Sequence, residues 1–149
     1  MKTFYQFLIL IILFSSASYS QTFEIGDIVK VGERLHFSVE KAGQWYSNND
    51  FIKPERGNIF YFILIYIKNI GYDSESYNVW NCTIKDSEGY SYTPTFWWPT
   101  PQLSAGELAD DEVVRGYVTF EIPQYAKGLK LHYSLSFWGS NKIIVQLTK

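Results

Sequence analysis

Residues 57–69, GNIFYFILIYIKN, decide the fold of this chain together with residues 113–123, VVRGYVTFEIP. Successive side chains of an extended strand point to opposite faces, and both faces of the first run are apolar. One face carries Ile59, Tyr61, Ile63, Ile65 and Ile67, and the other carries Phe60, Phe62, Leu64 and Tyr66. Such a strand is typical of the middle of a sheet. Residues 59–68 are therefore predicted to be a central strand whose aromatic-rich face is covered by a loop or a partner.

In residues 114–122 of the second run, apolar residues and one glycine alternate with residues that carry a polar group. Its expected core face consists of Val114, Gly116, Val118, Phe120 and Ile122, and the opposite face of Arg115, Tyr117, Thr119 and Glu121. Pro123 is expected to end the strand because it has no backbone donor.

Shorter runs with the same period of two fill the rest of the chain, and no stretch keeps helical spacing for long. Strands are expected at residues 23–31, 35–39, 77–84, 90–93, 129–137 and 142–148. Turns are expected at Gly32 and at residues 85–89 and 138–141, and Trp80 is expected to share a strand face with Cys82 and Ile84. About seven or eight short strands predict an all-β, two-sheet antiparallel β-sandwich.

The first twenty residues are predicted to be a cleaved secretory signal. Lys2 supplies the positive start, residues 7–14 are apolar, and small residues precede the expected cleavage point after Ser20. Residues 4–14 are interrupted by Gln6 and are too short to span a bilayer, so no transmembrane segment is expected in the mature chain. No cysteine near Ser20 offers a lipid acceptor. We expect an exported protein, periplasmic or extracellular, that is not a lipoprotein.

Composition limits the possible partners. Residues 21–149 are enough for one domain and too few for two ordinary ones. The chain has 13 Lys and Arg against 15 Asp and Glu, a net charge of -2, so no cationic excess favours nucleic acid. Cys82 is the single cysteine, which excludes an intrachain disulfide. The fold must therefore rest on packing, for which eleven Phe, twelve Tyr and five Trp provide the material.

Residues 94–111 show no clear alternation and are longer than most structureless loops, so the candidate site is placed here. The candidate ligand-binding residues are Tyr90, Tyr92, Phe96, Trp97 and Trp98. One interpretation is an aromatic platform for a sugar ring or a partner side chain. The other is a plug that closes the open end of the sandwich.

Other polar residues give weaker signals. The acidic residues Glu107, Asp110, Asp111 and Glu112 lack the ligand spacing of a calcium loop, so a solvated turn is expected. His36 and His132 fall on the polar faces of their strands, and no activated-serine motif accompanies them. No catalytic residue, metal site or cofactor is therefore predicted.

Several short motifs occur in an order that resembles a known family. They are Gly26-Asp27, Val29-x-Val31-Gly32, Gly57 with the strand ending at Asn69, Asp86-x-x-Gly89-x-x-Tyr92, Gly106-Glu107, and residues 116–123. This order is similar to that of exported bacterial telokin-like domains, which are immunoglobulin-like β-sandwiches of unknown function and are similar in fold to the mycobacterial immunoprotective extracellular antigen. The resemblance spans residues 22–148 and implies the fold, but no functional residues. Two departures are the missing lipid-bearing cysteine and an insertion at residues 108–112.

The functional hypothesis from the sequence is a non-catalytic protein-interaction module at the cell envelope or outside the cell. Its expected contact surface is the 94–112 loop with the exposed aromatic residues of the central strand. The alternative hypothesis is a carbohydrate-binding module, with a cell-wall glycan on an aromatic platform.

Overall fold

The computed structural model describes residues 21–71, 73–97, 99–135 and 141–149 of the chain. The elements are β1 (Thr22–Glu24), β2 (Val29–Val31), β3 (Leu35–Trp45), β4 (Asn58–Asn69), β5 (Glu75–Asn78), the 3-10 helix η1 (Val79–Asn81), β6 (Cys82–Lys85), β7 (Ser91–Tyr92), β8 (Ala105–Leu108), β9 (Val113–Pro123), β10 (Lys130–Ser134) and β11 (Lys142–Gln146). A five-stranded sheet has the order β1-β11-β10-β6-β7, a four-stranded sheet the order β2-β3-β4-β9, and β5 pairs with β8 in a two-stranded ribbon.

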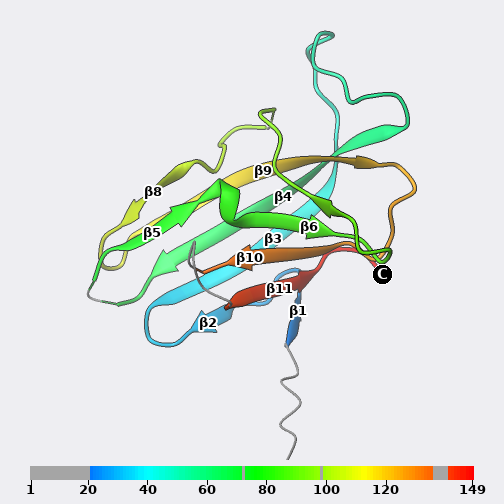
Figure 1. Cartoon of the computed structure of the whole chain (residues 1–149). Coiled ribbons are helices and arrows are strands. Elements are labelled where there is room, and N and C mark those ends of the chain that lie inside the picture. Colours follow the sequence, from blue (N-terminus) through cyan, green and yellow to red (C-terminus); the bar gives the residue numbers. More distant parts are fainter. Residues whose placement is uncertain (1–20, 72, 98, 136–140) are drawn as a thin grey trace, which may run out of the picture.

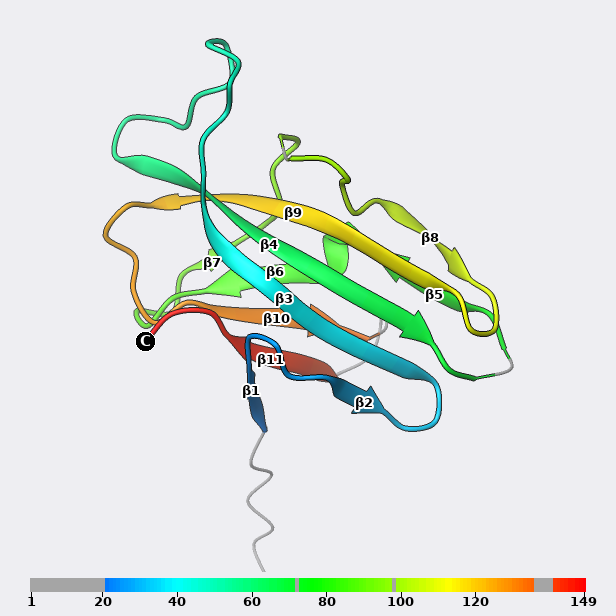
Figure 2. The same cartoon turned by 180° about the vertical axis from the view of Figure 1, so that it is seen from behind.

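The two larger sheets form the layers of a sandwich. The layer with β6, β10 and β11 lies in front in Figure 1, and the layer with β3, β4 and β9 lies in front in Figure 2. The β5–β8 ribbon lies beside β9 at one end, and the β3–β4 connection projects from the other. The prediction of an all-β two-sheet sandwich is confirmed.

Strand β4 is the central strand of its sheet, as predicted. It pairs antiparallel with β3 along one edge and with β9 along the other. A register shift between Val39 and Lys41 marks a β-bulge in β3. The extra residue there is Glu40, whose carboxylate reaches Arg115 on β9. The ion pair between Glu40 on β3 and Arg115 on β9 therefore crosses over β4, which lies between these strands.

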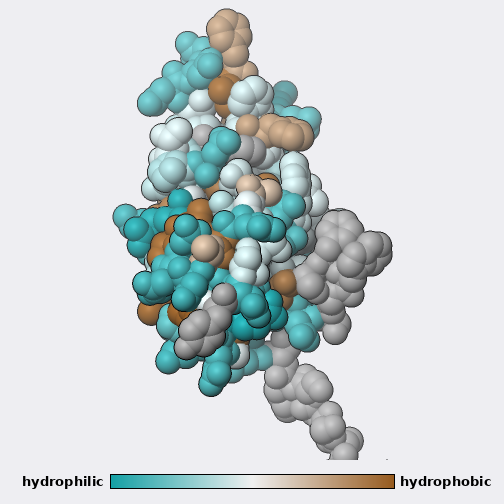
Figure 3. Space-filling view, turned by 90° about the vertical axis from the view of Figure 1, so that its left-hand side faces the viewer, coloured by the Kyte–Doolittle hydropathy of each residue, from teal (hydrophilic) through white to brown (hydrophobic). Residues whose placement is uncertain are grey.

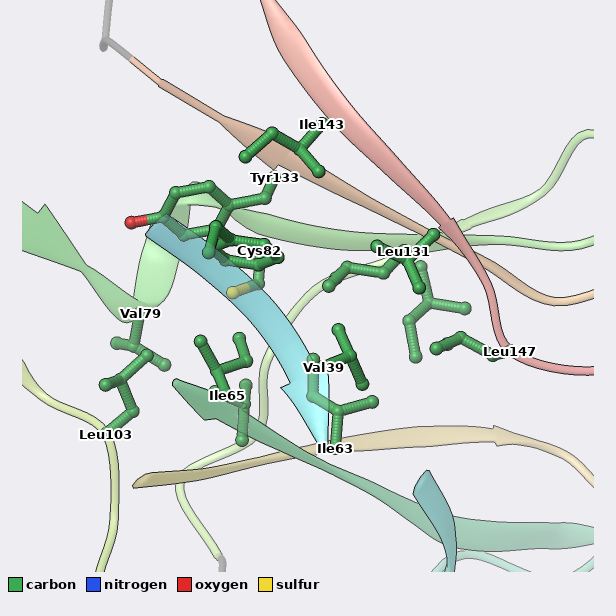
Figure 4. Close-up of a cluster of buried hydrophobic side chains, with 14 of the residues drawn as sticks. Val39, Ile63, Ile65, Val79, Cys82, Leu103, Leu131, Tyr133, Ile143 and Leu147 are labelled. Carbon is green, nitrogen blue, oxygen red and sulfur yellow. The ribbon is translucent and has the colours of Figure 1, made fainter. Parts of the chain in front are cut away.

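The core lies between the two larger sheets (Figure 4). Ile63 and Ile65 of β4 are fully buried, as are Val118 and Phe120 of β9, which confirms the expected core face of residues 113–123. Each such side chain contributes about 1.5–3 kcal/mol by leaving water. The opposite layer contributes Cys82, Ile84, Leu131, Tyr133, Ile143 and Val145.

Residues 23–31, expected as one strand, instead form two strands in different sheets. β1 pairs in parallel with β11, and β2 pairs antiparallel with β3. The turn between them is held because the backbone N–H of Glu24 donates to Asp27 at 2.8 Å and that of Gly26 to the Val39 carbonyl at 2.8 Å. Such breaks raise the number of described strands to eleven, above the expected seven or eight.

Asn69 ends β4 and fastens the β5–β8 ribbon to the sandwich. Its fully buried side chain donates to the Asp73 and Leu108 carbonyls at 2.7 and 2.9 Å and accepts from the N–H of Gly71 at 2.9 Å. A buried amide with three partners avoids the cost of unsatisfied polar groups.

The C-terminal strands are shorter than expected. β10 and β11 occupy Lys130–Ser134 and Lys142–Gln146 within the predicted ranges 129–137 and 142–148. Most of the predicted turn at 138–141 lies outside the described residues.

Candidate functional site

Tyr90 and Tyr92 belong to the predicted β6–β7 hairpin, which the structure confirms. Asp86 organises its turn: one carboxylate oxygen accepts from the backbone N–H groups of Glu88 and Tyr90 at 3.0 and 2.9 Å, and the other from the Tyr92 hydroxyl at 2.7 Å. Burial, and then the hydrogen bond to Asp86, raises the pKa of Tyr92. Tyr92 packs against the core and its hydroxyl is engaged within the hairpin, whereas Tyr90 is exposed.

Residues 94–97 and 99–103 do not form a free loop, because hydrogen bonds attach them to the outer edge of β9. The Thr95 N–H donates to the Thr119 carbonyl at 2.8 Å, and Tyr117 exchanges bonds with the Pro101 carbonyl and the Leu103 N–H at 2.8 and 2.9 Å. Pro94 also forms a β-bridge with Phe120. The predicted loop at 94–111 is corrected further by β8, which occupies Ala105–Leu108. This segment thereby satisfies the backbone N–H and C=O groups of Tyr117 and the C=O group of Thr119 on the edge of β9.

Phe96 and Trp97 protrude between these attachment points and are 74% and 50% exposed. The Thr95 hydroxyl holds the protrusion, because it accepts from the Trp97 N–H at 3.2 Å and donates to the Trp97 carbonyl at 3.0 Å. Leu103 of the same segment is fully buried. The described part of the segment thus closes the sandwich with Leu103 and leaves Phe96 and Trp97 in solvent. Trp98, also a candidate, lies outside the described residues.

Trp80 joins this surface and was missed in the sequence. Its ring lies 5.7 Å from that of Phe96 at an interplanar angle of 67°, and it is 51% exposed. The expectation that Trp80 shares a core face with Cys82 and Ile84 is wrong, because η1 interrupts the predicted 77–84 strand and turns Trp80 outward. The sequence did contain a signal for this short helix, because Asn is a residue type that favours helix N-caps. Asn78 caps η1 by accepting a hydrogen bond from the Trp80 N–H at 3.0 Å. We call Trp80, Phe96 and Trp97 the aromatic cluster.

Side chains of the neighbouring strands β3 and β9 pack against those on the outer face of β4. Phe62 meets Tyr117 of β9 edge-on with ring centroids 5.6 Å apart, and Trp45 of β3 lies 5.6 Å from Phe60. The Arg115 guanidinium lies 5.4 Å from the centre of the Tyr66 ring, with Glu40 accepting from its nitrogens at 2.7 and 2.8 Å. Phe60 and Leu64 are buried on this face.

The acidic residues after β8 behave as a turn. The Glu112 carboxylate accepts from the Ala109 N–H at 2.7 Å, and Asp111, with φ of 62°, pairs with Lys68 at 2.5 Å. Figure 3 looks onto this end of the sandwich, where hydrophilic side chains predominate. Across the described ranges, no three His, Cys, Asp or Glu side chains are arranged to hold a metal ion.

The two histidines lie on different sheets. His36 borders an open hollow of about 560 Å³ whose charged lining includes the Arg34–Glu75 ion pair. His132 lies on the outer face of the five-stranded sheet, where burial, followed by the charges of Lys85, Lys142 and Lys130, lowers its pKa. The thiol of Cys82 is fully buried, which raises its pKa. The thiol of Cys82, the single cysteine of the chain, is therefore not accessible as a nucleophile beside either histidine.

No curated protein matches the chain. Over the described residues, no helix has the length and apolarity to span a bilayer.

Three solved structures of bacterial proteins are similar to this chain in fold. The yjhA protein from Bacillus subtilis is 27% identical with a TM-score of 0.66, over 85% of this chain and 99% of that one. MPT63, described as a secreted protein from Mycobacterium tuberculosis, is 14% identical with a TM-score of 0.64, over 87% and 99% of the two chains. The Bacillus subtilis putative lipoprotein ycdA is 15% identical with a TM-score of 0.60, over 79% of this chain and 38% of that one.

The sandwich, its motif order and these structural likenesses agree with a family model that matches residues 23–143: the chain belongs to the family described as Domain of unknown function (DUF4352).

Proposed function

We propose that this protein is an exported, non-catalytic interaction module that binds a protein partner through the aromatic cluster. The observation that carries the proposal is that Trp80, Phe96 and Trp97 are each at least half exposed on backbone that is held in place. Exposed aromatic side chains normally cost solubility, so a group of them marks a contact surface. Trp is also enriched among the residues that dominate binding energy at protein interfaces.

The shape of the cluster favours a protein over a sugar. The Trp80 and Phe96 rings stand at 67° to each other, so they form a ridge, whereas the C–H face of a sugar ring stacks best on a flat aromatic surface. Side chains of a protein partner can pack against either side of such a ridge. In the alternative carbohydrate platform, Tyr92 would be poorly placed to stack, because its hydroxyl is bound to Asp86 and its ring is half-buried.

Export is supported by residues 1–20, which have the composition of a signal peptide, and by structural neighbours described as a secreted protein and a putative lipoprotein. The mature domain would comprise residues 21–149 in the periplasm or outside the cell, without a lipid anchor. The absence of catalysis is supported by the burial of Cys82 and by the exposed, open hollow at His36.

The test compares three single variants as baits for cross-linking in an envelope extract of the source organism. Trp80→Ala and Phe96→Ala should each lose at least about tenfold of the cross-linked partner, because truncation of an aromatic anchor typically costs about 2 kcal/mol or more. Phe51→Ala is the matched control, because Phe51 is 97% exposed on the β3–β4 connection and is not part of the aromatic cluster.

Equal loss in the Phe51 control, or no loss in the other two variants, would refute the protein-interaction proposal. A saturable shift of tryptophan fluorescence with a neutral cell-wall oligosaccharide, abolished by Phe96→Ala, would instead favour the carbohydrate alternative.

A further inference from the structure

The outer face of the five-stranded sheet gathers cationic side chains from three strands. Leu131 and Tyr133 of β10 are buried in the core, so the alternate residues Lys130, His132 and Ser134 face outward. The same alternation turns Thr83 and Lys85 of β6, and Lys142, Ile144 and Gln146 of β11, to that face.

The strand register brings these cations close together. Lys130 lies directly opposite Lys85 on β6, and Lys142 lies opposite Ser134 at the other end of β10. His132 lies between them, and the charges of all three lysines act on it in the same direction. We call Lys85, Lys130, Lys142 and His132 the cationic face. Along β10 it extends over about 13 Å, at about 3.3 Å per residue.

Acidic residues do not neutralise this surface. Among the described residues, none of the three lysines is in an ion pair. Among the described strand residues, Glu24 of β1 is the acid that faces outward on this sheet; it lies opposite Gln146 and two strands away from Lys130. Asp86 follows Lys85 in the chain, but its carboxylate accepts from Tyr92 and the hairpin backbone. Like charges directly opposite in a sheet destabilise it, so this arrangement costs folding free energy that an anionic ligand would recover.

We propose that the cationic face binds an anionic polysaccharide. Carboxylate or sulfate groups spaced along a glycan complement cations spread over three neighbouring strands. The polar side chains of Thr83 and Ser134 lie among the cations and supply hydrogen-bonding groups for sugar hydroxyls. The cationic face shares no residue with the aromatic cluster, so the proposal does not depend on the protein partner.

Nucleic acid fits this face less well. Proteins that bind single strands combine positive charge with aromatic rings on which bases stack. The described residues that face outward on β1, β6, β10 and β11 include no Phe, Tyr or Trp. The net charge of -2 for the whole chain conceals the local charge of this face, and this is why the charge count alone showed no cationic excess.

The experiment measures binding of the purified domain, residues 21–149, to fluorescent dextran sulfate and polygalacturonate by anisotropy from 25 to 200 mM salt. Neutral dextran is the uncharged control. The test variant is Lys85→Gln/Lys130→Gln/Lys142→Gln. The matched control is Lys30→Gln/Lys41→Gln/Lys53→Gln, which changes the net charge equally at exposed positions away from the five-stranded sheet.

The expected result is binding to both anionic polymers and none to neutral dextran. The test variant should bind at least about tenfold more weakly, and its dependence of log K on log salt should be shallower by about one for each lysine that contacts the polymer. The control variant should stay within about twofold of wild type, because loss of distant charges is screened over about 10 Å at 0.1 M salt.

A second readout separates binding from folding. Relief of the opposed charges should leave the test variant at least as stable as wild type in urea, so weaker binding could not be attributed to unfolding. Binding should also raise the pKa of His132, measured by NMR, because an anion among the lysines favours the imidazolium.

Three outcomes would overturn the proposal: equal loss of affinity in both triple variants, no binding to either anionic polymer at 25 mM salt, or tighter binding of single-stranded DNA than of both glycans.

Discussion

Gly116 of β9 should be intolerant of a single added methyl group. A Cβ at this position would lie 2.5 Å from the Leu103 nitrogen, 2.7 Å from the Leu103 Cα and 2.8 Å from the Gln102 carbonyl carbon. All three are backbone atoms, so no side-chain rotation relieves the contact. Either the 94–103 segment or β9 must move in Gly116→Ala.

The loss in free energy of unfolding depends on which contacts that movement disturbs. Overpacking a tight interior costs about 1–3 kcal/mol, and weakening one hydrogen bond between Leu103 and Tyr117 adds about 0.5–1.5 kcal/mol. Partial exposure of Leu103, which is fully buried, adds up to about 1 kcal/mol if a third of its burial is lost. The expected loss in free energy of unfolding is therefore about 2–5 kcal/mol.

Urea unfolding followed by circular dichroism and tryptophan fluorescence measures this loss. Gly43→Ala on β3 is the control, because the nearest atom to its added Cβ is on the Phe62 ring, at 3.4 Å, and its cost should be under about 1 kcal/mol. If Gly116→Ala were within about 0.5 kcal/mol of wild type, or if Gly43→Ala cost as much, the close packing of the 94–103 segment against β9 would be refuted.

Three further predictions concern buried or titrating groups. Asn69→Leu should lower the free energy of unfolding by about 2–4 kcal/mol, because it leaves buried backbone groups without partners; Asn58→Leu, with a half-buried amide, is the control, and equal costs in urea would contradict the prediction. Cys82 should react with a thiol reagent at least about 100-fold more slowly in the folded protein than in urea, because burial disfavours its thiolate, and rapid native labelling would show the thiol to be accessible. Because the pKa of folded His132 is lowered below its unfolded value of about 6.5, only the unfolded chain gains its proton as the pH first falls below that value. The free energy of unfolding of wild type relative to His132→Gln should then decrease between pH 7.5 and 5, and a constant difference would contradict the lowered pKa.

The candidate site could be predicted only in part. The exposed Phe96 and Trp97 lie in the stretch that the sequence singled out, because 94–111 lacks a strand period. Trp80 was placed in the core, because a period of two does not reveal a three-residue helix within a strand-like run. Its contact with Phe96 joins residues 16 positions apart, which no local pattern encodes.

The sequence by itself determined the all-β class, the central position of residues 58–69, the core face of β9 and the β6–β7 hairpin. These features depend on local alternation and turn chemistry, which act between residues a few positions apart. Only the tertiary structure decided that β1 and β2 enter different sheets, that Thr95, Pro101 and Leu103 bind the edge of β9, and that lysines from three strands share one face. These features depend on which strands become neighbours, and strand order is set by packing of the whole core rather than by any single segment.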